Sequence, residues 1–420
     1  MWKIARQENP IWYFDATGSI NKDVEGQKKP MFYALVFHDT THKSIIPFAE
    51  FVTTANDQTS ISKYLCSIKL KLDENSKENI LPKIIVTDMG WALINAAMLT
   101  FNCCNVSNYL NWCYDMMFKP YDLVLSNSMK IKSYLCSTHF LKNIIKKAKS
   151  VTVFSNHITS TFIFMFTLVQ NSISVKQIEI YLKHIHNIFN NPYLDWTVYE
   201  SLNFMSKEIR HRKLSFLNSE METSPQQKER DEHFEYFLKQ SNMYNNVDHD
   251  DNIKINSPFT MHYDLLMTQL NSDLNAKSKN NLLNVVLNEY FCPQLFAILE
   301  EKLYMIPLWS GIMIRSEIEN FKIKTRLTNN PVENWFGQVK NHILCKIKKR
   351  LASVLVTLLY SRLLSKYYEY YSTLEKKVDQ NKTEKEKLNK LYEQWSDKNI
   401  KRKNKGEFLI FIIIILITNH

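Results

Sequence analysis

Glycine is scarce in this chain, with only 6 among 420 residues. Neither a G-x-x-x-x-G-K-S/T loop nor a G-x-G-x-x-G loop is present, so the sequence has no glycine-rich cradle for nucleotide phosphates. This absence argues against nucleotide-driven motors, kinases and dinucleotide-dependent enzymes. Any phosphate chemistry is therefore expected to depend on metal ions and carboxylates, without a small-molecule cofactor.

Paired cysteines are missing as well. The seven cysteines are odd in number and irregularly spaced, and no C-x-x-C pair occurs. Because the sequence also shows no signal peptide, this pattern indicates a reducing intracellular compartment rather than a disulfide framework. A conventional cysteine-rich zinc module is not expected.

Long apolar runs are absent too. Residues 408–417 form a ten-residue apolar run, which is shorter than the ~17–25 residues that a membrane-spanning helix needs. A buried strand and an accidental extension past the original reading frame are alternative interpretations. A membrane anchor ranks last among the three.

The composition that is present supports a folded protein with a polyanionic partner. The chain is 45% hydrophobic and 13% aromatic, enough for two or three packed domains. Its formal net charge is +11 and its sequence pI is near 9.0, which favours a partner such as DNA. A modest lysine excess that serves only solubility is the competing interpretation.

The hydrophobic pattern predicts an α/β protein with a mixed sheet. Three consecutive strands are followed by helices that alternate with strands, which is the element order of a ribonuclease H-like fold. The predicted strands cover residues 11–14, 31–38, 44–53, a run that ends at Asp88, and 134–136; the predicted helices cover 57–72, 91–101 and 140–149.

The rest of the sequence predicts a helical insertion, a closing helix and a tail. We expect a large helical insertion to interrupt the sheet domain before a closing helix, with a charged helical tail after it. The predicted segments are 1–150 (first part of the ribonuclease H-like core), 151–325 (all-α insertion), 326–362 (closing catalytic helix), 363–407 (charged helical tail) and 408–420 (short apolar tail).

Three carboxylates are the main candidate site residues. Asp15 and Asp88 each end an apolar strand, and Glu333 lies near the start of a helix. Carboxylates that converge on one sheet edge could hold divalent metal ions through oxygen. Each also has a structural alternative: Asp15 as an acceptor in a turn, Asp88 as the N-cap of the next helix, and Glu333 as part of a capping box.

Cys136 and His139 form a C-x-x-H element between these carboxylates. Their spacing could supply two ligands to zinc, but no second ligand pair stands nearby in the sequence. A structural role is the preferred interpretation, with Cys136 packed in the core and His139 hydrogen-bonded near the acidic edge.

Basic residues follow Glu333 along the same predicted helix and are candidates for contacts with DNA phosphates. They are Lys340, Lys346, Lys348, Lys349 and Arg350. A solvated helix face is the alternative for this stretch. Arg402 and its lysine neighbours form a weak nuclear-localisation signal.

Together these motifs resemble the DDE transposases of the Mutator-like (MULE) and hAT group. The resemblance covers about residues 12–341 and rests on Phe14-Asp15-Ala16-Thr17-Gly18, Val86-Thr87-Asp88, the Cys136/His139 element and Asn330-Pro331-Val332-Glu333. It implies a ribonuclease H-like catalytic domain whose triad Asp15, Asp88 and Glu333 holds two Mg²⁺ or Mn²⁺ ions. It also implies cleavage and transfer of DNA strands in the nucleus, with self-association of the chain as a further expectation.

Two functional readings stay open. The first is an active metal-dependent transposase or nuclease. The second is a catalytically inactive or domesticated, transposase-derived protein that binds nucleic acid, favoured because only ten residues precede the first strand, whereas the family usually carries an upstream DNA-binding module. A ribonuclease H-like nuclease unrelated to transposition is a third reading, which the Cys136/His139 element and the insertion disfavour.

Overall fold

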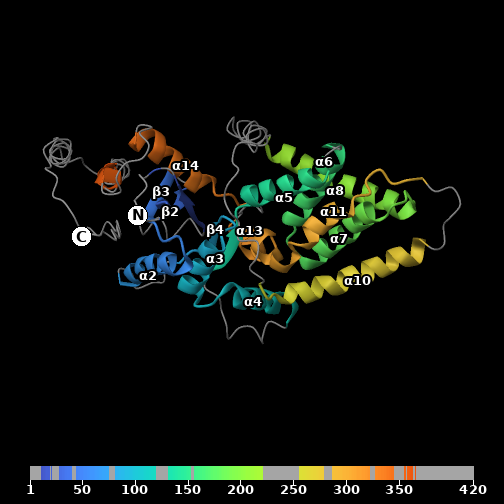
Figure 1. Cartoon of the computed structure of the whole chain (residues 1–420), viewed down its shortest axis with the longest axis horizontal. Coiled ribbons are helices and arrows are strands. Elements are labelled where there is room, and N and C mark those ends of the chain that lie inside the picture. The colour runs from blue at the N-terminus through green and yellow to red at the C-terminus, as the bar shows by residue number, and fades with distance from the viewer. Residues whose placement is uncertain are drawn as a thin grey trace. The chain divides into compact units, whose positions relative to one another are not determined.

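The computed structural model contains a five-stranded mixed sheet with helices, so the α/β prediction is confirmed (Figure 1). The strand order is β3-β2-β1-β4-β5. The chain divides into two compact units, Met1–Ile80 with Asn329–His420 (unit 1) and Leu81–Thr328 (unit 2). The structure describes residues 11–18, 20, 28–39, 44–74, 81–119, 131–152, 156–220, 255–278, 286–321, 327–344, 354–355, 357–362 and 365.

Unit 1 is built on three antiparallel strands, β1 (Ile11–Thr17), β2 (Met31–Asp39) and β3 (Ser44–Thr53). All three were predicted, and β3 has the predicted bounds. The register places Asp15 opposite Ala34 and Ala34 opposite Glu50. Since residues directly opposite one another share a face, Asp15 and Glu50 lie in one row on the same face of this sheet.

The other face of the three strands packs on α2 (Gln58–Glu74). The ring of Phe51 lies between those of Tyr33 and Tyr64, with centroid distances of 4.4 and 3.8 Å. Asp57 caps the helix, because its Oδ1 accepts a hydrogen bond of 2.9 Å from the backbone N–H of Ser60. The predicted helix and its cap are therefore confirmed.

The face that carries Asp15 and Glu50 is covered by α14 (Asn330–Gln338) and the π-helical turn η5 (Val339–Ile343). Phe336 meets Phe32 edge to face at 5.7 Å. The Nζ of Lys340 donates to Oγ1 of Thr17 at 2.7 Å. The helix that carries Glu333 is thus fixed to this sheet face at several points.

Unit 2 begins with two parallel strands, β4 (Ile84–Thr87) and β5 (Lys132–Leu135), and β4 is buried throughout. Between them lie α3 (Trp91–Ala97), a π-helical turn η1 (Met98–Asn102) and α4 (Val106–Phe118). The hydrophobic pattern predicts α3 with η1, and β5 to within two residues. It does not predict α4.

The rest of unit 2 is helical (Figure 1), and its core includes the buried Trp309. Trp309 is stacked at 5.2 Å on both Phe140 and Phe166. Tyr134 of β5 donates its hydroxyl hydrogen to the backbone oxygen of Trp309 at 3.3 Å. The helices are α5 (Ser137–Val151), α6 (Asn156–Gln170), α7 (Val175–Asn190), α8 (Trp196–Glu220), α10 (Pro258–Ser278), α11 (Pro293–Glu300), η4 (Leu303–Met305), α12 (Ile306–Trp309) and α13 (Arg315–Phe321).

The helices α6 to α13 agree with the helical character predicted for residues 151–325. The predicted domain boundaries stay predictions. The contacts between residues define only the two compact units given above. Within the described ranges, no helix is both long enough and apolar enough to cross a membrane.

Candidate metal centre

Asp88 directly follows β4, where its carboxylate meets the first turn of α5. Nδ1 of His139 forms a short hydrogen bond with Oδ1 of Asp88. Because an ionised carboxylate only accepts hydrogen bonds, the imidazole is the donor in that state. The side chains of Asp88 and His139 are 31% and 26% exposed, so solvent and ions can reach them.

The backbone explains why these residues meet. The N–H of Cys136 donates to the carbonyl of Thr87 at 2.8 Å, which joins the end of β4 to the N-cap of α5. His139 lies three residues after Cys136, on the same side of the first helical turn. The prediction that His139 is hydrogen-bonded near an acidic strand end agrees with this arrangement.

Cys136 completes a group of three potential metal ligands. Its side chain is buried, and its Sγ, a carboxylate oxygen of Asp88 and a ring nitrogen of His139 all lie within 4.8 Å of one another. We call these three residues the Asp–Cys–His group. One oxygen, one sulfur and one nitrogen ligand make a donor set that suits Zn²⁺ as well as harder ions.

The alternative role of Asp88 as a helix cap is wrong. The N-cap of α3 is Gly90, and no side chain caps that helix. The backbone oxygen of Asp88 accepts a 2.7 Å hydrogen bond from the N–H of Gly90. Its carboxylate forms a hydrogen bond with His139 of α5 and does not cap α3.

Asp15 does not lie at the exit of its strand, as the sequence suggested. The strand β1 continues through Thr17, so Asp15 is an interior position and only 6% exposed. Its Oδ1 accepts a hydrogen bond of 2.7 Å from the N–H of Ala16. The expected rim position is corrected because Ala16 and Thr17 still pair with β2.

Glu333 is half-buried in the first turns of α14. The helix begins at Asn330, and the side chain of the N-cap residue Asn329 forms no cap hydrogen bond. The N–H of Glu333 donates to the carbonyl of Asn329 at 2.9 Å, as in a regular helix. Asp15 and Glu333 belong to unit 1 and Asp88 to unit 2, so the convergence of the triad stays a prediction.

Glu50 was missed by the sequence analysis. It is 3% exposed on β3, and its Oε1 accepts a short hydrogen bond from Nε1 of Trp335. Burial raises the pKa of Glu50 to about 8, and the hydrogen bond from Trp335 opposes that rise in part. The available signal was a lone acidic residue within the apolar run Phe48-Ala49-Glu50-Phe51-Val52.

The predicted DNA-contacting residues are only partly described. Lys340 is bonded to Thr17 and half-buried, so it is not a solvated lysine. Lys346, Lys348, Lys349 and Arg350 lie outside the described residues, as do Arg402, the apolar tail 408–420 and all of the charged tail 363–407 except residue 365. The predicted contacts with phosphates stay predictions.

A cleft of about 790 Å³ opens next to Asp88 in unit 2, with Met89 and Trp91 in its lining. Asp264, Glu300 and Glu301 line this cleft together with Lys302, which pairs with Glu301. Burial together with the charge of Asp264 raises the pKa of Glu300. Because carboxylates outnumber the one lysine among these lining residues, the cleft is unsuited to binding the phosphates of a DNA backbone.

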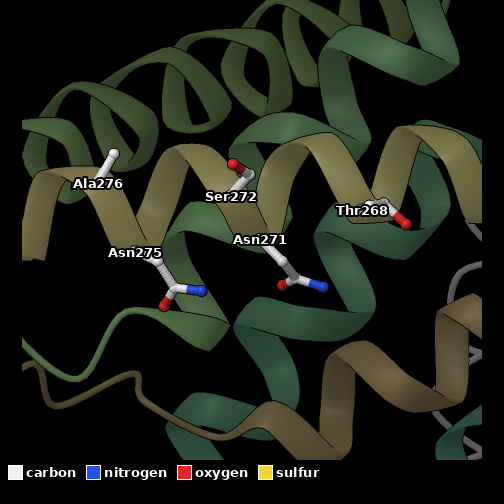
Figure 2. A pocket seen from close by; sticks show the side chains of 5 residues that line it. All are labelled: Thr268, Asn271, Ser272, Asn275 and Ala276. Carbon is white, nitrogen blue, oxygen red and sulfur yellow. The ribbon is translucent and has the colours of Figure 1, made fainter.

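A second hollow, of about 560 Å³, runs along α10 (Figure 2). Figure 2 shows Asn271 and Asn275 one turn apart, with Thr268, Ser272 and Ala276 beside them. None of these five lining residues ionises near neutral pH. These residues can form hydrogen bonds, but none of them is a charged metal ligand or a general acid or base.

Comparison of the sequence with protein family models yields no match, and comparison with curated proteins yields none either.

Proposed function

We propose that the chain is a metal-dependent enzyme that cleaves and transfers DNA strands in the manner of DDE transposases. The observation that carries the proposal is Asp88. Its carboxylate follows a buried strand, is partly exposed, and is held in one orientation by His139. Partly exposed carboxylates with a fixed orientation are typical ligands of catalytic metal ions.

A ribonuclease H-like catalytic domain is part of the same proposal. Its support is the order of elements, three antiparallel strands followed by helix, strand, helices, strand and helix. Further support comes from unit 1, where α14 carries Glu333 and packs on the sheet face that carries Asp15. The helices α6 to α13 lie where the resemblance implies a helical insertion, which supports the same proposal.

Asp15, Asp88 and Glu333 are the proposed metal ligands, and Mg²⁺ or Mn²⁺ the proposed ions. Three carboxylates form an all-oxygen donor set, which fits these hard ions. When bound, such ions activate a water or a DNA 3′-hydroxyl and stabilise the leaving oxygen of an in-line displacement. The contribution of His139 is to hold the Asp88 carboxylate in position, since it donates to one of the two carboxylate oxygens.

The test is cleavage of duplex DNA by the purified chain in Mn²⁺, with wild type compared with Asp88→Ala. We expect cleavage by wild type and background cleavage by the variant. Asp115→Ala is the matched control, because it also removes a carboxylate from unit 2, in a surface pair with Lys119. Equal cleavage by wild type and Asp88→Ala would contradict the proposal.

A second candidate function is a transposase-derived DNA-binding protein without catalytic activity. The burial of Asp15 favours it, since a 6% exposed carboxylate is less accessible to a hydrated ion. This function predicts no cleavage by wild type in Mn²⁺, together with DNA binding that weakens steeply as salt rises. A binding constant that hardly changes with salt would contradict it.

A further inference from the structure

The Asp–Cys–His group has the chemistry and the geometry of a transition-metal site. In a tetrahedral site with bonds of about 2.0–2.3 Å, neighbouring ligand atoms are roughly 3.3–3.8 Å apart. The three ligand atoms of the group already lie within 4.8 Å of one another. Small side-chain rotations can therefore bring them around one ion without moving the backbone.

The backbone around the group is firmly held. Besides the bond between Cys136 and Thr87, the N–H of Ser137 donates to the carbonyl of Leu327 at 2.9 Å. The carbonyl of Cys136 accepts from the N–H of Phe140, also at 2.9 Å. Cys136 and His139 are thus presented on a fixed helical turn, which lowers the entropic cost of binding an ion.

The types of ligand decide which ion is preferred. A thiolate and an imidazole favour borderline ions such as Zn²⁺ over Mg²⁺, while the carboxylate serves both. The partly exposed side of His139 gives an ion a route in, and the buried Sγ of Cys136 gives it a strong inner ligand. Within the described part of the chain, the group has three ligands, which leaves one position of a tetrahedral ion for water.

We propose that the Asp–Cys–His group is a site for Zn²⁺, and that zinc bound there prevents Asp88 from binding Mg²⁺ or Mn²⁺. The second part rests on the proposed function, whereas the first stands on the group alone. The three-ligand site could not be predicted from local sequence spacing, because the third ligand, Asp88, follows β4 and lies 48 residues before Cys136.

Cobalt substitution tests the site directly. Co²⁺ is titrated into the metal-free full-length chain while the thiolate-to-cobalt charge-transfer absorption is recorded. We expect saturation at one equivalent, displacement by Zn²⁺, and loss of the band in Cys136→Ser. Cys66→Ser removes an exposed cysteine of α2 and is the matched control, expected to keep the band.

A second variant guards against misfolding of Cys136→Ser, with circular dichroism as the check on both. His139→Gln is expected to keep the sulfur band but to weaken cobalt binding at least tenfold. A wild-type chain without a saturable sulfur band would overturn the site. So would a well-folded Cys136→Ser that gives the same band as wild type.

Competition for Asp88 is measured by electron paramagnetic resonance of Mn²⁺, without DNA. We expect one equivalent of Zn²⁺ to release bound Mn²⁺ from wild type and to release much less from Cys136→Ser. Release of equal amounts from both would overturn the competition. A wild-type chain that binds cobalt but no Mn²⁺ contradicts the proposed function and the competition, and leaves the zinc site standing.

Discussion

At the scale of single residues, Glu50 couples the stability of unit 1 to pH. Its pKa is raised from an ordinary value of 4.5 to about 8, chiefly by burial. The folded chain therefore keeps a proton that the unfolded chain releases above about pH 4.5. The stabilisation from this group is complete below that pH and is lost as pH rises towards about 8.

We expect the free energy of unfolding to fall across this window, by roughly 5 kcal/mol at most. In Glu50→Gln the decline should be much smaller, because the amide is neutral at every pH and its oxygen still accepts from Trp335. Urea unfolding of both proteins at several pH values measures the difference. Parallel curves for wild type and variant would contradict the assignment.

Only part of the candidate site could be predicted from the sequence. Asp88 and His139 could be selected from the sequence because a strand end and a C-x-x-H element are local patterns. Their hydrogen bond could not be predicted, since it depends on the parallel pairing of β4 with β5. Glu50 was missed for a related reason: its buried carboxyl keeps a proton and accepts a hydrogen bond from Trp335, which lies 285 residues later in the chain.

At the scale of elements, the attachment of α14 to its sheet depends on the indole of Trp335. In Trp335→Phe the ring is largely kept, but Oε1 of Glu50 loses its donor. We expect destabilisation of about 1–3 kcal/mol in urea unfolding. The pKa of Glu50 should also rise further, because this hydrogen bond is the influence that lowers it.

Trp112→Phe is the matched control for this change. The Nε1 of Trp112 is buried in α4 and has no hydrogen-bond partner among the described residues, so its removal costs no hydrogen bond. We expect at most a small packing loss there. If both variants were destabilised equally, the role of the indole N–H would be refuted.

Most elements could be predicted where the periodicity was simple. The strands β2 and β3 are long apolar runs, and the buried stripe of α2 recurs at helical spacing. The helix α4 was missed because its aromatic and asparagine residues resemble neither a strand nor a clear amphipathic helix. Its start depends on a local cap, in which Oδ1 of Asn105 accepts from the N–H of Asn108 at 2.8 Å.

At the scale of the whole molecule, each unit has its own core, and Trp309 is central to that of unit 2. It is fully buried and packs against both Phe140 and Phe166, which also contact each other. We expect Trp309→Ala to cost about 3–5 kcal/mol. Hydrogen exchange read by mass spectrometry should accelerate most in α5 and α6, and less in β2 and β3 of unit 1.

Trp196→Ala is the control at this scale, because Trp196 is 69% exposed and its loss leaves no cavity. Its exchange pattern should match that of wild type. Acceleration of the same size in both units after Trp309→Ala would show that the two cores do not respond separately.

Unit 1 is built from two segments far apart in the chain, which affects how it folds during translation. The ribosome releases β1, β2 and β3 early, but α14 follows only after all of Leu81–Thr328. At about 5–20 residues per second, the 285 residues from Glu50 to Trp335 take tens of seconds. Throughout that delay the sheet face that carries Phe32, Asp15 and Glu50 lacks its covering helix. We therefore expect the growing chain to need protection from aggregation, as a chaperone provides.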